Sequence, residues 1–236
     1  IIPYFSFARS DKKDAPRISI TARLIADLLQ TAGATQVTTM VLHSPQVHGF
    51  FSVPTDHLTS RPIFVDYFKQ FDLSDTIVVS PDLGGAKSAA RFAKELGLPI
   101  TAGNKERISD TRVEITGLVG GQVTGLRRAL VYDDEIATGG TIMELAEVLS
   151  RQGIEEVWVA CTHGVFVRGA FERLVSLPFV TKVVTTDTVP QPLSHPKLEV
   201  LCMAEVFGES ILRNYHHQSI EDYFAFSDRT LEESNG

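Results

Sequence analysis

The stretch that decides the fold is Leu130-Val131-Tyr132-Asp133-Asp134-Glu135-Ile136-Ala137-Thr138-Gly139-Gly140-Thr141. Its apolar start predicts a buried strand that ends on two adjacent carboxylates, Asp133 and Asp134. A small, glycine-rich turn follows, and a helical pattern begins at Thr141. Backbone N–H groups in such a turn, at the positive end of a helix, form a site for a phosphate. The paired acids can hold ribose hydroxyls or a divalent cation, so a sugar phosphate fits the whole stretch. The simpler alternative is a strand, turn and helix whose acids are only solvated.

Strands and helices alternate on both sides of this stretch. We predict strands at residues 37–42, 76–80, 128–133, 157–162 and 182–186, and helices at residues 18–31, 86–96, 141–152 and 170–175. This alternation predicts an α/β fold with a parallel sheet and helices on both of its faces. Ligands of such sheets bind at the carboxyl ends of the strands, where Asp82, Asp133 and His163 fall. The turn-rich passage at residues 45–62 is predicted to link two domains.

Composition limits the classes of function. The chain has 236 residues, 43% of them hydrophobic and 22% charged, which is typical of a globular protein with one large or two small domains. The net charge of −7 argues against a nucleic-acid partner. Because no apolar run approaches the length of a membrane span, we expect no membrane partner. Cys161 lies in an apolar run and is expected to be a reduced core thiol of a cytoplasmic protein.

Two segments near the start of the chain carry candidate binding groups. Arg9, Lys12, Lys13 and Arg17 gather four cations within nine residues, which could hold a polyphosphate or could form a solvated loop. His43 follows a predicted strand, where it could ligate a metal, contact a nucleotide or serve only the structure.

Two further segments lie after the predicted linker. Asp82-Leu83-Gly84-Gly85 precedes a helix and forms a second candidate anion site, with Asp82 placed to hold Mg²⁺ beside it. Gly103-Asn104-Lys105-Glu106-Arg107 is predicted to be a polar loop. A loop of this kind could close over a transferring phosphoryl group and neutralise its charge, or could be an ordinary surface loop.

Taken together and in this order, these segments resemble the ribose-phosphate diphosphokinase family, also called phosphoribosyl pyrophosphate synthetase. The resemblance is most specific at Ile2-Pro3-Tyr4, Phe7-Ala8-Arg9, Asp11-Lys12-Lys13-Asp14, Leu42-His43, Gln46, Gly49-Phe50-Phe51, Ser80-Pro81-Asp82, Gly84-Gly85, Asp133-Asp134 and Ala160-Cys161-Thr162-His163-Gly164. It runs from Ile1 to about Phe224. Since Ile1-Ile2-Pro3-Tyr4-Phe5 resembles the end of a strand inside a domain, we expect the chain to be truncated at its N-terminal side.

The resemblance implies two related phosphoribosyltransferase-like domains, the first of them incomplete. We expect residues 1–56 to be the remnant of the first domain, on the ATP side, and residues 57–204 to be the second, on the ribose 5-phosphate side. Residues 205–224 would return to the first domain, and residues 225–236 would be a polar tail. The implied reaction transfers the diphosphoryl group of ATP to ribose 5-phosphate with Mg²⁺ as cofactor, in a homo-oligomer.

The resemblance also implies roles for individual residues. The ATP site would contain Arg9, Ser10, Asp11, Lys12 and His43, and the metal sites would contain His43 and Asp82. Lys105 and Arg107 would be the catalytic cations, and Asp82, Leu83, Gly84 and Gly85 would form the diphosphate loop. Ribose 5-phosphate would be held by Asp133, Asp134, Ala137, Thr138, Gly139, Gly140 and Thr141.

Four positions depart from the pattern that is usual in the family. Ser10 stands in place of a Gln that contacts ATP, Val41 and Ser52 in place of frequent acids, and Ala137 in place of a common Asp. The Ala137 turn resembles that of purine phosphoribosyltransferases, so a transferase that consumes the activated sugar is one alternative. A catalytically weakened regulatory homologue of the synthetase is the other, favoured by Val41 and Ser52.

Overall fold

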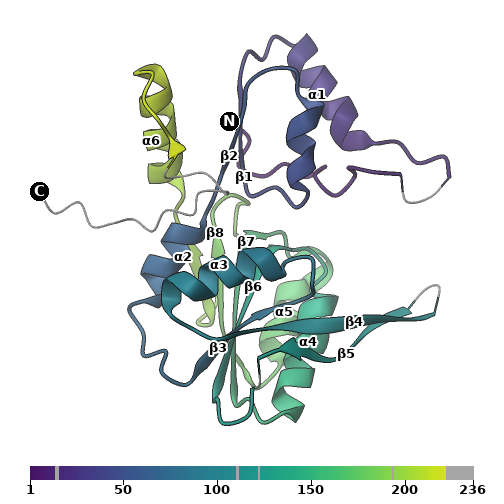
Figure 1. Ribbon diagram of the computed structural model, residues 1–236, viewed down its shortest axis with the longest axis vertical. Helices are drawn as coiled ribbons and strands as arrows, with labels where there is room; N and C mark the ends of the chain where they lie inside the picture. Colours follow the sequence, from purple (N-terminus) through teal and green to yellow (C-terminus); the bar gives the residue numbers. More distant parts are fainter. Residues whose placement is uncertain (14–15, 110–111, 122, 193, 222–236) are drawn as a thin grey trace, which may run out of the picture. The chain divides into compact units, whose positions relative to one another are not determined.

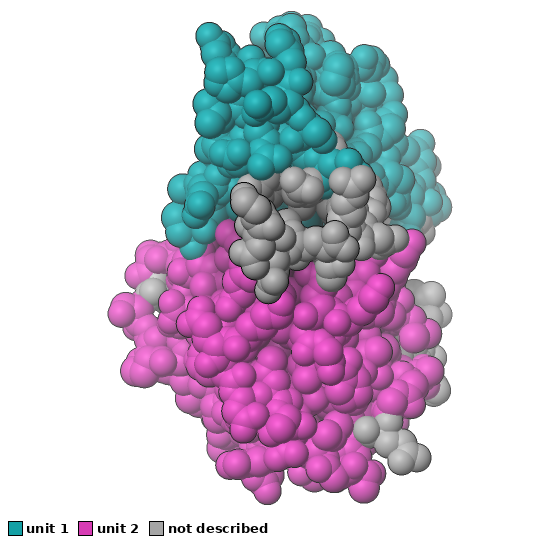
Figure 2. Space-filling view, turned by 60° about the vertical axis from the view of Figure 1, so that its left-hand side comes forward, with its two compact units in different colours: residues 1–60, 202–236 teal, residues 61–201 magenta. Residues whose placement is uncertain are grey.

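The structure is a computed structural model that describes residues 1–13, 16–109, 112–121, 123–192 and 194–221, with the backbone alone described at residues 105–109 and 112–114. It divides into unit 1, residues 1–60 and 202–236, and unit 2, residues 61–201 (Figure 2). The predicted tail at residues 225–236 and the last three residues of the predicted returning segment, 222–224, lie outside the described residues. No helix within the described ranges is long and apolar enough to cross a membrane.

A seven-stranded sheet forms the centre of unit 2, with the strand order β5-β4-β3-β6-β7-β8-β9. The strands are β3 (Thr76–Ser80), β4 (Ile100–Ser109), β5 (Arg112–Gly120), β6 (Arg128–Ile136), β7 (Glu156–Gly164), β8 (Val180–Thr186) and β9 (Leu198–Leu201). All neighbouring pairs are parallel except β4 and β5, which form an antiparallel hairpin at one edge.

Helices cover both faces of this sheet (Figure 1). Helices α2 (Arg61–Phe68) and α3 (Ala86–Leu96) pack on one face, while α4 (Gly140–Arg151) and α5 (Ala170–Ser176) pack on the other. Successive strand residues point to opposite faces, so Val78 lies in the core under α2 and α3, whereas Ile77 and Val79 lie in the core under α4 and α5. The predicted α/β class, with a mostly parallel sheet between two layers of helices, is confirmed.

The order of the strands creates a switch point in unit 2. The chain runs from β3 through α3 to β4 on one side, and later continues as β6 on the other side of β3. In sheets of this kind, ligands bind outside the carboxyl ends of the strands at the point where the direction reverses. A ligand is therefore expected beside the residues that follow β3 and the last residues of β6.

Unit 1 is smaller and contains a two-stranded parallel sheet of β1 (Val37–Met40) and β2 (Thr55–Leu58). Its other elements are α1 (Thr21–Thr31), a 3-10 helix (Pro45–Phe50) and α6 (Ala204–Tyr215). Phe5, Ala22, Val37, Leu42 and Phe51 belong to its buried core. Gly33 lies just after α1 and has a φ of +101°, a conformation that glycine adopts without strain.

The structure corrects three of our element predictions. Residues 103–107 are not a loop, because they belong to β4. This strand pairs with β5 from Thr101, which lies opposite Gly120, to Ser109, which lies opposite Arg112. The passage at residues 45–62 is not made of turns alone, because it contains the 3-10 helix and β2, which pairs with β1; that it links two domains stays a prediction. Strand β6 continues to Ile136, three residues beyond its predicted end.

Candidate functional site

Three acidic residues lie near the carboxyl ends of the adjacent strands β3 and β6, at the switch point of unit 2. Asp82 follows β3, and Asp133 and Asp134 lie in the last part of the adjacent strand β6. Burial raises the pKa of Asp133 well above its usual value, and the negative charges of Asp134 and Asp82 raise it further. The structure thus brings the predicted acids close enough for their negative charges to repel one another. A cation or sugar hydroxyls bound at this point would reduce that repulsion.

The glycine-rich turn after β6 leads directly into α4. Gly139 has a φ of +72°, a left-handed conformation that glycine adopts without strain, and it immediately precedes the first residue of α4, Gly140. The first N–H groups of a helix have no partners within it and carry its positive dipole end. The turn at residues 137–141 thus ends at the N-terminus of a helix, which is a typical place for an anion, and phosphate binding there stays a prediction.

The second predicted anion site, at residues 82–85, holds a carboxylate in the structure. Asp82 Oδ1 accepts hydrogen bonds from the backbone N–H groups of Gly84, at 2.9 Å, and Gly85, at 3.2 Å. Ser80 Oγ donates to the carbonyl oxygen of Asp82 at 2.7 Å, which holds the same turn from its other side. These two bonds form an Asx turn, in which the carboxylate of Asp82 itself occupies the amides that face this side of the loop.

A buried polar network at the ends of β7 and β8 was not predicted in this form. His163 Nδ1 lies 2.9 Å from Thr188 Oγ1, and the hydroxyls of Thr186 and Thr188 both donate to the carbonyl oxygen of Thr162. His163 pairs with Glu135 of β6, two residues past Asp133. The threonines at positions 185, 186 and 188 were the available signal, because threonines at a strand end can form such networks in place of apolar contacts.

Unit 1 brings two of the predicted ATP-side segments together. Asp11, which is buried, accepts a hydrogen bond from Gln46 Nε2 at 2.6 Å, and this contact joins the segment around Arg9 to the segment after His43. The hydroxyl of Ser10 accepts from the Thr21 N–H at the start of α1 and donates to the Ser19 carbonyl, both at 3.2 Å. These bonds hold Asp11 and Ser10 in place, and the neighbouring residues Arg9 and Lys12 are exposed.

The backbone before His43 is strained and held in place. Val41 has a φ of +36°, which is a genuine outlier for a β-branched residue, and its N–H donates to the Leu58 carbonyl at 3.0 Å. The next N–H, that of Leu42, donates to His57 Nε2 at 2.8 Å. These two bonds fix the direction in which the chain presents His43, whose side chain is exposed. His43 belongs to unit 1 and Asp82 to unit 2.

The predicted catalytic cations, Lys105 and Arg107, lie on β4 rather than on a loop. The pairing with β5 shifts its register between Asn104 and Lys105, where Thr116 is the extra residue. Bulges of this kind occur at functional sites and turn a strand locally. Next to this bulge, Gly103 of β4 pairs with Leu118 of β5, and Asn104 pairs with Gly117.

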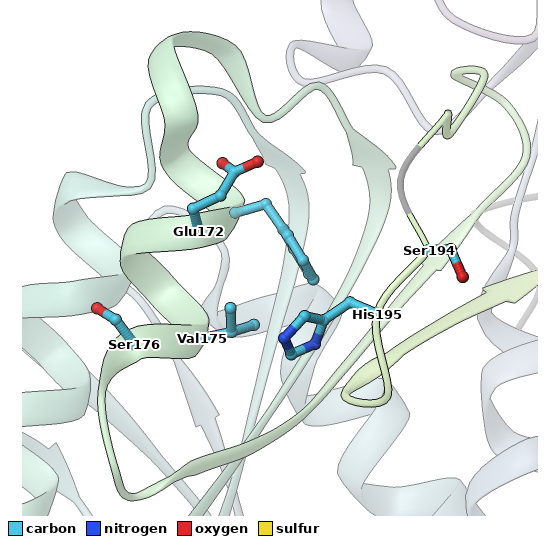
Figure 3. Close-up of a pocket in the computed structure, with 6 residues that line it drawn as sticks. Glu172, Val175, Ser176, Ser194 and His195 are labelled. Atoms are coloured by element: carbon cyan, nitrogen blue, oxygen red, sulfur yellow. The ribbon is translucent and has the colours of Figure 1, made fainter.

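A hollow of about 380 Å³ lies on unit 2, apart from the predicted site residues (Figure 3). Phe171, Glu172, Val175 and Ser176 come from α5, and Ser194 and His195 come from the segment before β9. The His195 ring packs edge-on against Phe171 at 5.5 Å, and its Nδ1 accepts the Lys197 N–H at 3.1 Å. No residue that the sequence analysis assigned to a site lines this hollow.

The fold and its switch point define the class of this protein: an α/β protein with the phosphoribosyltransferase-like arrangement of a mostly parallel sheet. Residues 104–225 match the family described as "Phosphoribosyl synthetase-associated domain", and residues 1–33 match the "N-terminal domain of ribose phosphate pyrophosphokinase". The chain belongs to the ribose-phosphate pyrophosphokinase family.

Individual relatives agree with this membership. The chain is 43% identical over 231 residues to a ribose-phosphate pyrophosphokinase of Deinococcus radiodurans, covering 95% of this chain and 71% of that protein. It is 41% identical over 227 residues to the enzyme of the same name from Gloeobacter violaceus, covering 95% of this chain and 68% of that protein. The crystal structure of phosphoribosylpyrophosphate synthetase from Mycobacterium smegmatis matches with a TM-score of 0.82 and 34% identity, over 91% of this chain and 70% of that chain.

Proposed function

We propose that this protein transfers the diphosphoryl group of ATP to the anomeric hydroxyl of ribose 5-phosphate, giving 5-phosphoribosyl 1-diphosphate and AMP. One observation carries the proposal. Two glycine-rich turns, at residues 82–85 and 137–141, follow the adjacent strands β3 and β6 at the switch point of the sheet, beside the carboxylates of Asp82, Asp133 and Asp134. A sugar phosphate that receives a diphosphate needs all three features: one turn for each phosphate end and acids for the ribose hydroxyls.

The proposed roles follow from this chemistry. The turn at residues 137–141 would bind the 5-phosphate, Asp133 and Asp134 would bind ribose hydroxyls, and the loop at residues 82–85 would bind the transferred diphosphate. Arg9, Ser10, Asp11, Lys12 and His43 would bind ATP from unit 1. Lys105 and Arg107 would neutralise the charge that spreads over the phosphoryl oxygens in the transition state, which is the largest contribution a protein makes to phosphoryl transfer.

The residues fit the implied Mg²⁺. Within the described part of the chain, no three His, Cys, Asp or Glu side chains gather as a closed metal site. Mg²⁺ with phosphate substrates instead uses one or two carboxylates and completes its shell with phosphates and water. Asp82 of unit 2 and His43 of unit 1 would each lie at a Mg²⁺ site, and bound Mg²⁺ would neutralise phosphate oxygens of ATP. We also propose a cytoplasmic homo-oligomer, as the resemblance implies.

Two other functions remain as outcomes of the test. A phosphoribosyltransferase would explain Ala137 in the phosphate turn, but it has no need of the segment tied to Gln46 through Asp11. A regulatory homologue without activity would explain Val41 and Ser52, which stand where the family frequently has acids.

The experiment measures AMP release from ATP, Mg²⁺ and ribose 5-phosphate, with each substrate omitted in turn as the control. AMP that requires both substrates supports the proposal. Release of diphosphate from 5-phosphoribosyl 1-diphosphate in the presence of a purine base, without AMP release, would replace it with the transferase. If neither reaction occurs, the regulatory alternative is the better description.

A further inference from the structure

Three consecutive carbonyl groups of the phosphate turn are held by one neighbouring segment. The carbonyl oxygen of Ile136 accepts from the N–H groups of Val165 and Phe166, both at 3.0 Å. The Ala137 carbonyl accepts from the Val167 N–H at 2.9 Å. The third carbonyl, that of Thr138, accepts from a side chain instead: Arg173 Nη2 on α5 donates to it at 3.0 Å.

These bonds determine where the amides of the turn point. The described backbone contains no cis peptide bond, and in a trans peptide the C=O and the following N–H point in opposite directions. The carbonyls of residues 136–138 face the segment at residues 165–173, so the N–H groups of Ala137, Thr138 and Gly139 face away from it. Among the described residues, none accepts a hydrogen bond from these three amides. Successive amides that share a direction form an anion-binding nest.

Arg173 therefore donates to the Thr138 carbonyl in the way that backbone N–H groups donate to the carbonyls of Ile136 and Ala137. Its second terminal nitrogen, Nη1, donates to the carbonyl of Arg168, so one guanidinium joins the phosphate turn to the bend before α5. That bend is conformationally costly, because Phe166 has a φ of +42° and Arg168 a φ of +56°. A planar fork can bind two carbonyls at once, which the single ammonium of lysine does less well.

We propose that Arg173 is a positioning residue for the 5-phosphate of ribose 5-phosphate. It acts through the Thr138 carbonyl, whose hydrogen bond keeps the Gly139 N–H aimed at the phosphate. This inference rests on the proposed function of the turn, and it assigns a role to a residue outside the glycine-rich motif. The N–H groups of Ala137 and Thr138 are fixed by backbone bonds and keep their direction without Arg173.

The experiment measures ribose 5-phosphate binding by calorimetry, and steady-state kinetics, on the wild type, Arg173→Met and Arg173→Lys. Loss of one aligned, charge-assisted hydrogen bond should weaken ribose 5-phosphate binding, and raise its KM, about tenfold in Arg173→Met. The KM for ATP should stay unchanged. Arg173→Lys should fall between, because lysine keeps the charge but reaches one carbonyl only.

The matched control is Arg151→Met. Arg151 is also an exposed arginine that donates to a backbone carbonyl, that of Glu147 at 3.2 Å, but it lies at the opposite end of α4. This variant should bind ribose 5-phosphate as the wild type does. A thermal melt of each variant separates weaker binding from general unfolding.

The outcomes distinguish this inference from the proposed function. A wild type that does not bind ribose 5-phosphate contradicts the proposed function itself. If the wild type binds and Arg173→Met binds equally well, the function stands and the role of Arg173 is wrong. If Arg173→Met does not fold, Arg173→Lys is the deciding variant. The inference is wrong if Arg173→Lys has the wild-type KM for ribose 5-phosphate, or if its KM values for ribose 5-phosphate and ATP rise equally.

Discussion

At the scale of single residues, the adjacent acids Asp133 and Asp134 could be predicted as site residues because their order is readable from the chain: acids, glycine-rich turn, helix. Arg173 could not be predicted in this way. It lies more than thirty residues after the turn, and only folding brings its guanidinium to the Thr138 carbonyl, at 3.0 Å. Sequence order reveals groups that act together locally, whereas long-range supports become visible only in the packed structure.

The first prediction concerns Asp133. If its carboxylate holds a ribose hydroxyl, Asp133→Ala should raise the KM for ribose 5-phosphate by roughly tenfold or more and change the KM for ATP far less, because a hydrogen bond to a charged group is lost. Steady-state kinetics with each substrate varied in turn measures this. Asp66→Ala, an exposed acid on α2, is the control. Equal effects on both substrates would show that Asp133 serves a metal or the fold instead.

A second prediction concerns Lys105. A cation that neutralises phosphoryl oxygens only in the transition state should leave ground-state binding intact. Lys105→Ala should therefore lower kcat by roughly 10²- to 10³-fold while both KM values and the melting temperature change little. Arg107→Ala should have a weaker effect of the same kind. Lys94→Ala, at an exposed position near the end of α3, is the control. A near-normal kcat for Lys105→Ala would refute its catalytic role.

At the scale of elements, several buried strands and helices were predictable, whereas helix α2 and the edge hairpin were not. The prediction for residues 76–80 matches β3, and that for residues 86–96 matches α3, because their apolar spacing is set by burial in the two cores. Residues 103–107 carry polar and charged side chains and no such spacing. Their strand conformation comes from backbone pairing with β5, which leaves little trace in the hydrophobic pattern.

Gly103 provides a test of how β4 meets the diphosphate loop. A Cβ at this position would lie 2.5 Å from the Pro81 carbonyl oxygen, too close for any side chain unless the backbone shifts. Gly103→Ala should destabilise the protein by roughly 1–3 kcal/mol, measured as a melting temperature lower by several degrees. Gly117→Ala is the matched control, because a Cβ there would meet no atom within 4 Å. Similar melting temperatures for the two variants would contradict the close approach.

Glu156, at the start of β7, makes stability depend on pH. Burial alone would raise the pKa of its carboxyl group, but hydrogen bonds from Thr181, Arg128 and Trp158 outweigh burial and lower that pKa below its usual value of 4.5. The stabilisation is therefore complete above the pKa of the unfolded chain and is lost as the pH falls through the folded-state pKa. Glu156→Gln should cost roughly 1–3 kcal/mol of unfolding free energy at pH 7, and less as the pH falls below about 4.5.

Denaturant unfolding of both proteins across this pH range measures the effect. Glu155→Gln is the control, because the adjacent Glu155 pairs with Arg127 in an ion pair whose side chains are 68% and 65% exposed, and such a pair contributes little. A cost for Glu156→Gln that stays constant from pH 7 to pH 3.5 would show that the charge of Glu156 is not its source.

At the scale of the whole molecule, the two units divide the proposed substrates. Unit 2 is one continuous segment, residues 61–201, and contains the seven-stranded sheet, both cores that cover it and every residue proposed to hold ribose 5-phosphate or the diphosphate. Unit 1 combines two separated segments of chain and contains the residues proposed to bind ATP. The sequence showed the order of these groups, but the point where the chain leaves unit 1 follows from packing.

The last prediction uses this division. Residues 61–201, expressed alone, should fold cooperatively, because the layers of α2 and α3 and of α4 and α5 cover both faces of the sheet within this one segment. The protein has a single tryptophan, Trp158, which is 5% exposed in the core under α2 and α3, so its fluorescence reports the unfolding of unit 2 alone. The fragment should show one fluorescence transition, and ribose 5-phosphate should raise its midpoint temperature, since a ligand that binds only the folded state stabilises it.

The fragment should release no AMP from ATP, because Arg9, Lys12 and His43 are absent from it. The whole chain is the control in each measurement. A fragment that turns over ATP would move the proposed ATP site into unit 2, and a fragment without a cooperative transition would show that unit 2 needs unit 1 to fold.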